Sequence, residues 1–288
     1  MSSPTLSFEF FPPKNLEGAF RLHDCVQTLA PLEPTFVSVT YGAGGTTRQL
    51  THEAVTAIQT TSALNVAAHL TCVDATKAET MQIADRYATS GVRDIVALRG
   101  DAPKEACNFA AHPDGFSSSV DLIGALSERG QFNIRVGAYP ETHPEAASPA
   151  ADIAYLKRKI DAGASSAITQ FFFEADTFFR FRDACVKAGI DAPIIPGILP
   201  ITSWQGTQRF AAQCGTSIPQ VVRDAFDKVN DPETETMLAT AVATELCDDL
   251  LIGGVDHLHF YTLNRPDLSR AVCKALGIQA KTQLQKVA

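Results

Sequence analysis

Residues 150–189 read AADIAYLKRKIDAGASSAITQFFFEADTFFRFRDACVKAG and contain the pattern that decides the fold. Residues 150–162 carry alanine, leucine and charged side chains at helical spacing, and Gly163 follows, where a helix can end. The apolar run 167–172 then predicts a buried β-strand, and a second amphipathic segment, 177–188, again ends at a glycine. A strand enclosed between two helices is typical of a parallel sheet covered by helices.

The same alternation of short β-rich runs and helical segments continues along the whole chain. The expected strands are residues 6–10, 35–41, 65–70, 94–98, 133–139, 167–172, 193–198 and 257–263. An open doubly wound sheet shows this alternation too, but eight units in 288 residues have the size of a closed barrel. We therefore expect an α/β fold, a single (βα)8 barrel of the TIM type.

The longest interval lies between the seventh and eighth expected strands. It predicts extra helices at 204–214, 219–228 and 233–251. No linker and no internal repeat interrupts the pattern. We expect residues 1–288 to form one catalytic domain.

Composition excludes several classes of function. The formal net charge is −8 and basic residues are scattered, which argues against a nucleic-acid surface. The seven cysteines form no CxxC pair and no zinc-ribbon spacing, which is typical of reduced thiols in a cytosolic protein. The N-terminus has no signal-peptide pattern, and no run of about 18 apolar residues occurs. We expect a cytoplasmic protein with no membrane and no nucleic-acid partner.

Catalytic groups of such barrels lie at the C-terminal ends of the strands, and polar side chains collect there in this sequence. Glu9 alternates with Phe8 and Phe10, so it should point into the barrel mouth. Shortage of water there is expected to raise its pKa into a range useful for protonating a substrate. The alternative is a structural glutamate that forms a salt bridge with a neighbour such as Arg265.

Other polar residues have both a structural and a functional interpretation. Asp101 follows Gly100, and a glycine lets the backbone approach a ligand, although an Arg-Gly-Asp sequence is usually just a loop. His69 lies inside an apolar strand, where a core histidine is the default. The cations of residues 157–159 normally form a solvated helix face, and a diphosphate is the alternative partner.

A metal-dependent barrel hydrolase is the rival from another class of enzyme. His257 and His259 alternate on one strand and would join His69 and Asp101 as ligands. His-x-His pairs of metal barrels usually lie on the first strand, where this chain has Phe-Glu-Phe. We therefore expect no metal.

Eight segments together resemble the successive signatures of methylenetetrahydrofolate reductases, in family order and over nearly the whole chain. They are SFEFFPP (7–13), SVTYGA (38–43), HLTC (69–72), ALRGD (97–101), YPETHPEA (139–146), TQFFF (169–173), PGILP (196–200) and FYTLNR (260–265). The length is similar to that of the short bacterial form. The resemblance implies reduction of 5,10-methylenetetrahydrofolate to 5-methyltetrahydrofolate, with non-covalent FAD and with NADH or NADPH as electron donor. It also suggests a homo-oligomer.

The resemblance assigns roles position by position. Glu9 matches the general acid, and Asp101 matches a group whose charge stabilises the iminium cation formed when the folate ring opens. Positions that match FAD contacts are Thr40, His69, Leu98, Arg99, Gly100, Asp101, Tyr139, His143, Ala146, Asp152, Arg158 and Lys159. Positions that match folate or nicotinamide contacts are Glu9, Asp101, Gln170, Phe210, Tyr261 and Arg265.

Two positions depart from the family pattern. Ser118 stands where relatives often have an aromatic residue able to stack on the adenine side of FAD, and Gly206 stands where some relatives have a substrate-contacting glutamine. A barrel that keeps its ligands without the reaction is the non-catalytic alternative. The presence of Glu9 and Asp101 speaks against it.

Overall fold

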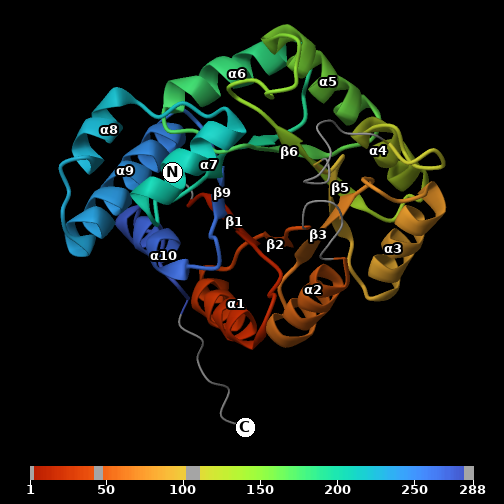
Figure 1. Ribbon diagram of the computed structural model, residues 1–288, viewed down its shortest axis with the longest axis horizontal. Coiled ribbons are helices and arrows are strands. Elements are labelled where there is room, and N and C mark those ends of the chain that lie inside the picture. The colour runs from red at the N-terminus through yellow and green to blue at the C-terminus, as the bar shows by residue number, and fades with distance from the viewer. Residues whose placement is uncertain (1–2, 42–47, 102–110, 282–288) are drawn as a thin grey trace.

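The computed structural model describes residues 3–41, 48–101 and 111–281, and its strands form a barrel surrounded by helices (Figure 1). The strands are β1 (Thr5–Phe10), β2 (Phe36–Val39), β3 (Val66–Thr71), β4 (Asp94–Leu98), β5 (Asn133–Ala138), β6 (Ser166–Thr169), β7 (Ile194–Ile195), β8 (Gly197–Ile198) and β9 (His257–Tyr261). They pair in parallel in the order β7-β6-β5-β4-β3-β2-β1-β9-β8. The predicted TIM-type α/β fold is confirmed.

The expected seventh strand is interrupted at Pro196. A proline has no backbone N–H to donate to a neighbouring strand, so the run divides into β7 and β8. β7 pairs with β6 and β8 pairs with β9, while the Pro196 carbonyl still accepts a hydrogen bond of 3.0 Å from the His259 backbone N–H. Together β7 and β8 occupy the seventh strand position and close the barrel between β6 and β9.

The helices cover the outside of the barrel (Figure 1). They are α1 (Leu16–Leu29), α2 (Arg48–Ser62), α3 (Lys77–Thr89), α4 (Ser119–Glu128), α5 (Pro149–Asp161), α6 (Ala175–Lys187), α7 (Trp204–Cys214), α8 (Gln220–Phe226), α9 (Pro232–Ile252), α10 (Pro266–Ala275) and the short 3-10 helix η1 (Ala30–Leu32). The interval between β8 and β9 holds α7, α8 and α9, where extra helices were predicted. No helix within the described ranges is long and apolar enough to cross a membrane.

Helix ends follow the local sequence signals. Thr76 and Glu79 form a reciprocal capping box at the start of α3, which satisfies backbone N–H groups that have no partner inside the helix. Gly163, after α5, has a φ of 120°, and a Cβ at this position would collide with Ser127. This turn therefore requires glycine.

An apolar layer fills the middle of the barrel. Phe36, Ala67, Val96, Ile168 and Ile195 are all buried and form one cluster. Such layers are typical of TIM barrels, whose interior is a packed core and not a pore. The layer separates the two ends of the barrel.

Candidate active site

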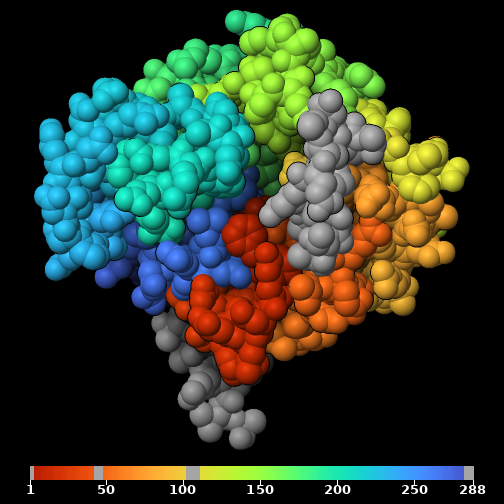
Figure 2. Space-filling model, in the orientation of Figure 1, coloured from red at the N-terminus to blue at the C-terminus, as the bar shows by residue number. Residues whose placement is uncertain are grey.

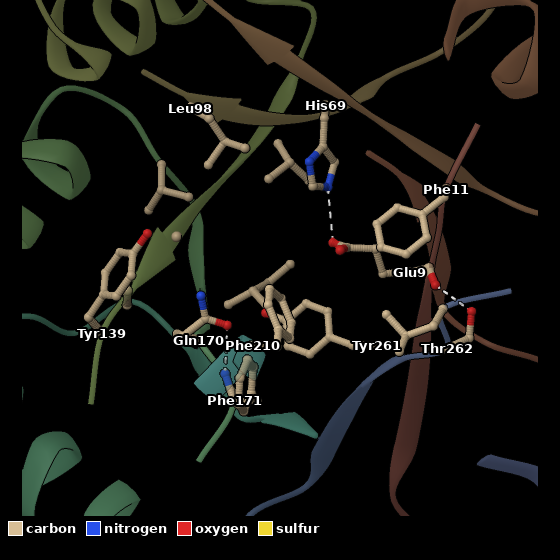
Figure 3. A pocket seen from close by; sticks show the side chains of 16 residues that line it. Glu9, Phe11, His69, Leu98, Tyr139, Gln170, Phe171, Phe210, Tyr261 and Thr262 are labelled. Carbon is tan, nitrogen blue, oxygen red and sulfur yellow. Dashed lines mark hydrogen bonds and ion pairs between the residues drawn. The ribbon is translucent and has the colours of Figure 1, made fainter. Parts of the chain in front are cut away.

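A pocket of about 210 Å³ lies at the C-terminal ends of the strands (Figure 3). The predicted residues among those that line it are Glu9, His69, Leu98, Tyr139, Gln170, Phe210 and Tyr261. They come from β1, β3, β4, β9 and α7 and from the segments that follow β5 and β6. In Figure 2, α7 (teal) and the N-terminal residues (red) lie on the same face of the molecule. Barrel closure therefore gathers side chains that are distant in the sequence.

Glu9 points into this pocket, as its alternation with phenylalanines predicted. Its side chain is 15% exposed, and its Oε2 lies 3.2 Å from Nε2 of His69 and 3.8 Å from Nε2 of His259. Ser38 Oγ donates a long hydrogen bond of 3.4 Å to the same oxygen. The alternative partner, Arg265, lies exposed at the start of α10 instead.

The predicted direction of the Glu9 pKa is wrong. Burial raises the pKa, as expected, but the charge of His69 and the close approach of the His259 and His69 rings outweigh burial and lower it to about 2. Alternation along β1 could not reveal these partners, because they come from β3 and β9. Glu9 and the two histidines form a coupled cluster in which the carboxylate is the anionic member.

Ser7 extends this cluster, and sequence reasoning missed it. Its buried Oγ lies 2.7 Å from Nδ1 of His259 and 2.8 Å from Nε2 of His257. The signal was available: Ser7 and Glu9 are two residues apart on one strand, as are the two histidines on another, so all four side chains face inward.

The histidines do not assemble a metal site. Among the described residues, no group of three or more His, Cys, Asp or Glu side chains has an arrangement that would hold a metal ion. His69 contacts Glu9, and His257 shares Ser7 with His259. The geometry thus gives no support to the barrel hydrolase.

Aromatic side chains form much of the pocket wall. Phe210, from α7, stacks on Phe171 with ring centroids 5.1 Å apart and is 38% exposed. Tyr261 donates a hydrogen bond of 2.6 Å to the Thr169 carbonyl, which fixes its ring in the barrel mouth. Gln170 also lines the pocket, and its Oε1 accepts from the Phe171 N–H at 3.1 Å (Figure 3). Flat apolar walls with a few polar groups suit a ring-shaped ligand.

The turn after β4 carries three of the predicted residues. Gly100 has a φ of 89°, and a Cβ would lie 2.7 Å from Val73, so only glycine fits without movement. Arg99 pairs with Glu145 at 2.6 Å. Asp101 lies exposed and does not line the pocket.

The charge of Asp101 nevertheless acts on the pocket wall. Burial, followed by the negative charge of Asp101, raises the pKa of Tyr139 to about 12. Tyr139 lines the pocket, and its ring contacts that of His143 at 4.5 Å. A cation formed in this pocket would therefore lie in the field of Asp101.

The remaining predicted residues after β5 lie beside the pocket. Asp152 accepts a hydrogen bond of 2.8 Å from the His143 backbone, and the Ala146 N–H bonds to the His143 carbonyl at 2.8 Å. Lys159 Nζ donates to the carbonyl of Gly137, a pocket residue, at 2.9 Å. Burial lowers the pKa of Lys159 to about 8, although Asp152 favours the charged form. The half-buried ammonium group of Lys159 therefore lies close to the pocket.

The other cofactor positions lie further out. Arg158 is exposed, with its guanidinium 5.4 Å from the ring centroid of Tyr155. Thr40 follows β2, and its carbonyl accepts a hydrogen bond of 3.0 Å from Thr51. Neither residue lines the pocket.

The two departures from the family pattern have local structural roles. Ser118 is the N-cap of α4, and its Oγ accepts a hydrogen bond of 3.2 Å from the Asp121 N–H. Gly206 lies in the first turn of α7, donates to Ser203 Oγ at 3.3 Å, and is not among the pocket residues. A serine at position 118 is thus accounted for by helix capping.

Comparison with known proteins links this geometry to a family. The family model described as methylenetetrahydrofolate reductase matches residues 1–277. The 5,10-methylenetetrahydrofolate reductase of Pectobacterium carotovorum is 46% identical over 95% of this chain and 90% of its own. The enzyme of that name from Escherichia coli K12 is 45% identical, with 95% and 91% covered. Methylenetetrahydrofolate reductase (NADH) 1 of Arabidopsis thaliana is 34% identical, and the match spans 97% of this chain and 49% of the plant protein.

Solved structures agree on the fold. An uncharacterized protein from Clostridium thermocellum that binds two copies of 5-methyl-5,6,7,8-tetrahydrofolic acid has a TM-score of 0.65, at 14% identity and 96% coverage of both chains. This identity supports a shared fold alone. From the family match over nearly its full length, together with the relatives near 45% identity, this chain belongs to the methylenetetrahydrofolate reductase family, oxidoreductases that reduce 5,10-methylenetetrahydrofolate to 5-methyltetrahydrofolate.

Proposed function

We propose that residues 1–288 act as one catalytic barrel in which Glu9 protonates 5,10-methylenetetrahydrofolate before hydride transfer. Electrons come from NADH or NADPH through non-covalent FAD. The observation that carries the proposal is the shielded carboxylate of Glu9, which lies in a pocket with aromatic walls and faces two histidines. A cyclic aminal resists hydride until a ring nitrogen is protonated and the ring opens to an iminium ion, so the reaction needs such an acid.

The cluster around Glu9 can supply the proton despite the lowered pKa of the carboxyl group. His69 Nε2 lies 3.2 Å from the carboxylate, within reach for proton exchange. When a ring ligand covers the pocket and removes water, the neutral form of the carboxyl group becomes more favourable. Binding of folate thus favours protonation of Glu9, which faces the substrate.

The neighbouring residues suit the folate substrate. Phe210 and Tyr261 offer flat surfaces to a pterin ring, and Gln170 offers an amide for its polar edge. Asp101 stabilises the iminium cation through the same field that raises the pKa of Tyr139. Arg265, exposed at the edge of the barrel face, is a contact for the outer part of a ligand.

The residues beside the pocket fit FAD. Lys159 and Arg158 offer cations for a diphosphate, and the missing side chain of Gly100 leaves room for close approach. A nearby diphosphate would offset the burial that lowers the Lys159 pKa. Leu98 and Tyr139 add an apolar wall. When bound, FAD supplies the hydride donor that side chains lack.

The relatives support further details of the proposal. The Arabidopsis relative carries NADH in its name, which favours NADH over NADPH as co-substrate. The homo-oligomer and the cytoplasmic location stay predictions from the sequence.

An absorption spectrum tests the cofactor directly. We expect the purified protein to be yellow with one non-covalent FAD per chain, to bleach anaerobically with NADH, and to regain its colour with methylenetetrahydrofolate. A protein that stays colourless after incubation with excess FAD would contradict the proposal. Stoichiometric zinc in a colourless protein would favour the hydrolase instead.

A further inference from the structure

A second cavity, of about 510 Å³, opens at the opposite end of the barrel. Its walls come from the starts of the strands and include Thr5, Asn133, Arg135 and His257. No step of the proposed reaction uses this cavity. The apolar layer of the barrel interior lies between it and the active-site pocket, since Ile195 lines the cavity whereas Val96 and Ile168 line the pocket.

Three polar side chains cross this apolar layer along the β1 and β9 wall. His257 Nε2 lies 2.8 Å from Ser7 Oγ, and Ser7 Oγ lies 2.7 Å from His259 Nδ1. His259 Nε2 then faces Glu9 at 3.8 Å. The centroids of both imidazole rings lie 5.8 Å from the ring centroid of Phe36, so this buried aromatic ring lines the path. A series of titratable and hydroxyl groups thus leads from the far cavity toward Glu9, hydrogen-bonded as far as His259.

We propose that His257, Ser7 and His259 conduct protons from the N-terminal cavity to Glu9, so that the acid is reloaded from the end of the barrel opposite to its substrate. This inference rests on the proposed role of Glu9 as proton donor. The donor loses one proton per turnover and must regain it, and FAD and folate would lie over its own mouth. A path through the barrel wall would let Glu9 regain its proton without dissociation of FAD or folate.

The proton balance of the path is complete. A proton from water in the cavity binds His257 Nδ1, and the proton on His257 Nε2 moves to Ser7 Oγ. The original hydroxyl proton of Ser7 moves to His259 Nδ1, and the proton on His259 Nε2 moves to the Glu9 carboxylate. One proton has entered and Glu9 is neutral, while each imidazole keeps one proton and the serine keeps its hydroxyl. Rotation of these groups restores the starting orientation.

The surroundings keep both imidazoles neutral, as this sequence of transfers requires. Burial lowers the pKa of His257 to about 4, with help from the charges of His259 and Arg135. Burial also lowers the pKa of His259, against the opposing effect of Glu9. Arg135 is itself paired with Asp94 at 2.8 Å. A neutral imidazole has one donor and one acceptor nitrogen, which is what a relay needs.

The step at Glu9 requires a small movement. A distance of 3.8 Å exceeds a hydrogen bond, so the His259 and Glu9 side chains must approach by roughly 1 Å for transfer. The His69 contact at 3.2 Å competes for the same carboxylate oxygen. The resting structure therefore shows the relay complete from His257 to His259 and open at its last step.

His257→Phe tests the relay in the reduced holoenzyme. Phenylalanine keeps a ring beside Phe36 but carries no proton. Mixed with methylenetetrahydrofolate in stopped flow, the variant should complete its first turnover at the wild-type rate, because the proton for that turnover need not come through the relay. Its steady-state kcat should fall by about tenfold or more, and the solvent deuterium isotope effect on kcat should rise. Asp256→Asn, in the same cavity but outside the path, is the matched control and should behave as wild type.

Two outcomes would overturn the relay. Unchanged steady-state turnover in His257→Phe would show that Glu9 is reloaded elsewhere, and equal slowing of the first and later turnovers would show a merely structural role. Rescue provides an independent check: imidazole in the buffer should restore kcat to His257→Ala but not alter Asp256→Asn. A wild-type first turnover in Glu9→Gln would instead refute the proposed acid, so the two failures are distinguishable.

Discussion

The two ends of the barrel hold cavities that differ in what their charged groups contact. The N-terminal cavity is the larger, about 510 Å³ against about 210 Å³. Its arginines are engaged: Arg135 pairs with Asp94 at 2.8 Å, and Arg182 donates to the Gly253 carbonyl at 3.0 Å. The C-terminal pocket is mostly apolar and holds the shielded carboxylate of Glu9 close to His69 and His259.

Cavity size alone therefore does not identify the pocket for which we propose catalysis. Arginines that are already engaged by protein groups offer no free cation to a ligand, whereas a carboxylate close to imidazoles is an arrangement suited to proton transfer. Substitutions at the C-terminal end should change the reaction, and substitutions at the N-terminal end should change stability or the supply of protons.

Among the variants that leave Glu9 intact, Asp101→Asn should have the largest effect on the rate of folate reduction. A neutral amide cannot stabilise an iminium cation as a carboxylate does, so folate reduction should slow by about 10²-fold with the fold retained. The FAD reduction potential should rise, because a nearby anion opposes the addition of negative charge. A redox titration with a lower potential than wild type would contradict this placement of Asp101.

His257→Phe should change acid stability. His257 has a pKa of about 4 when folded, against 6.5 as the ordinary value, so the unfolded chain binds more protons between these pH values. Wild type should therefore lose free energy of unfolding as pH falls from 6.5 to 4, and the variant should lose less. The difference is on the order of 2 kcal/mol at pH 4 after allowing for partial exposure. Parallel denaturation curves at pH 7 and pH 4 measure it, and identical pH dependence would contradict the buried neutral imidazole.

Ser118→Tyr should have the smallest effect, because two contributions oppose each other. An added aromatic ring offers FAD a stack worth about 0.5–1.5 kcal/mol, while loss of the N-cap of α4 costs about 1 kcal/mol of stability. Ser118→Ala, which removes the cap alone, is the matched control. FAD should dissociate more slowly from the tyrosine variant than from the alanine variant. Equal dissociation rates would remove position 118 from the adenine site.

The sequence predicted the fold well because strands and helices have characteristic hydrophobic periodicities and end at recognisable residues such as glycine. The strand starting at His257 and the glycine turn after α5 appeared where expected. The interruption at Pro196 was missed, although a proline within an apolar run argues against an uninterrupted strand.

The candidate site was predictable where it depends on strand alternation and not where it depends on loops. Alternation placed Glu9 inward, yet its pKa depends on His69 and His259, which only closure of the barrel brings near. Loop positions such as Asp101 and His143 have no periodic signal; they were noticed because they follow strand ends, and only the family resemblance gave them roles. Ser7 lies two residues before Glu9 and so faces the same side of β1. It was overlooked because a single serine in a strand is not a specific signal of function.

Glu9→Gln tests the central claim most directly. Glutamine keeps the shape and hydrogen bonds of glutamate but cannot donate the proton that opens the folate ring. In anaerobic stopped flow, reduction of FAD by NADH should stay within about tenfold of wild type, while reoxidation by methylenetetrahydrofolate should fall by roughly 10²–10⁴-fold, the usual contribution of a positioned acid. A structural glutamate predicts equal loss in both half-reactions. Reoxidation of Glu9→Gln at the wild-type rate would show that Glu9 is not the proton donor.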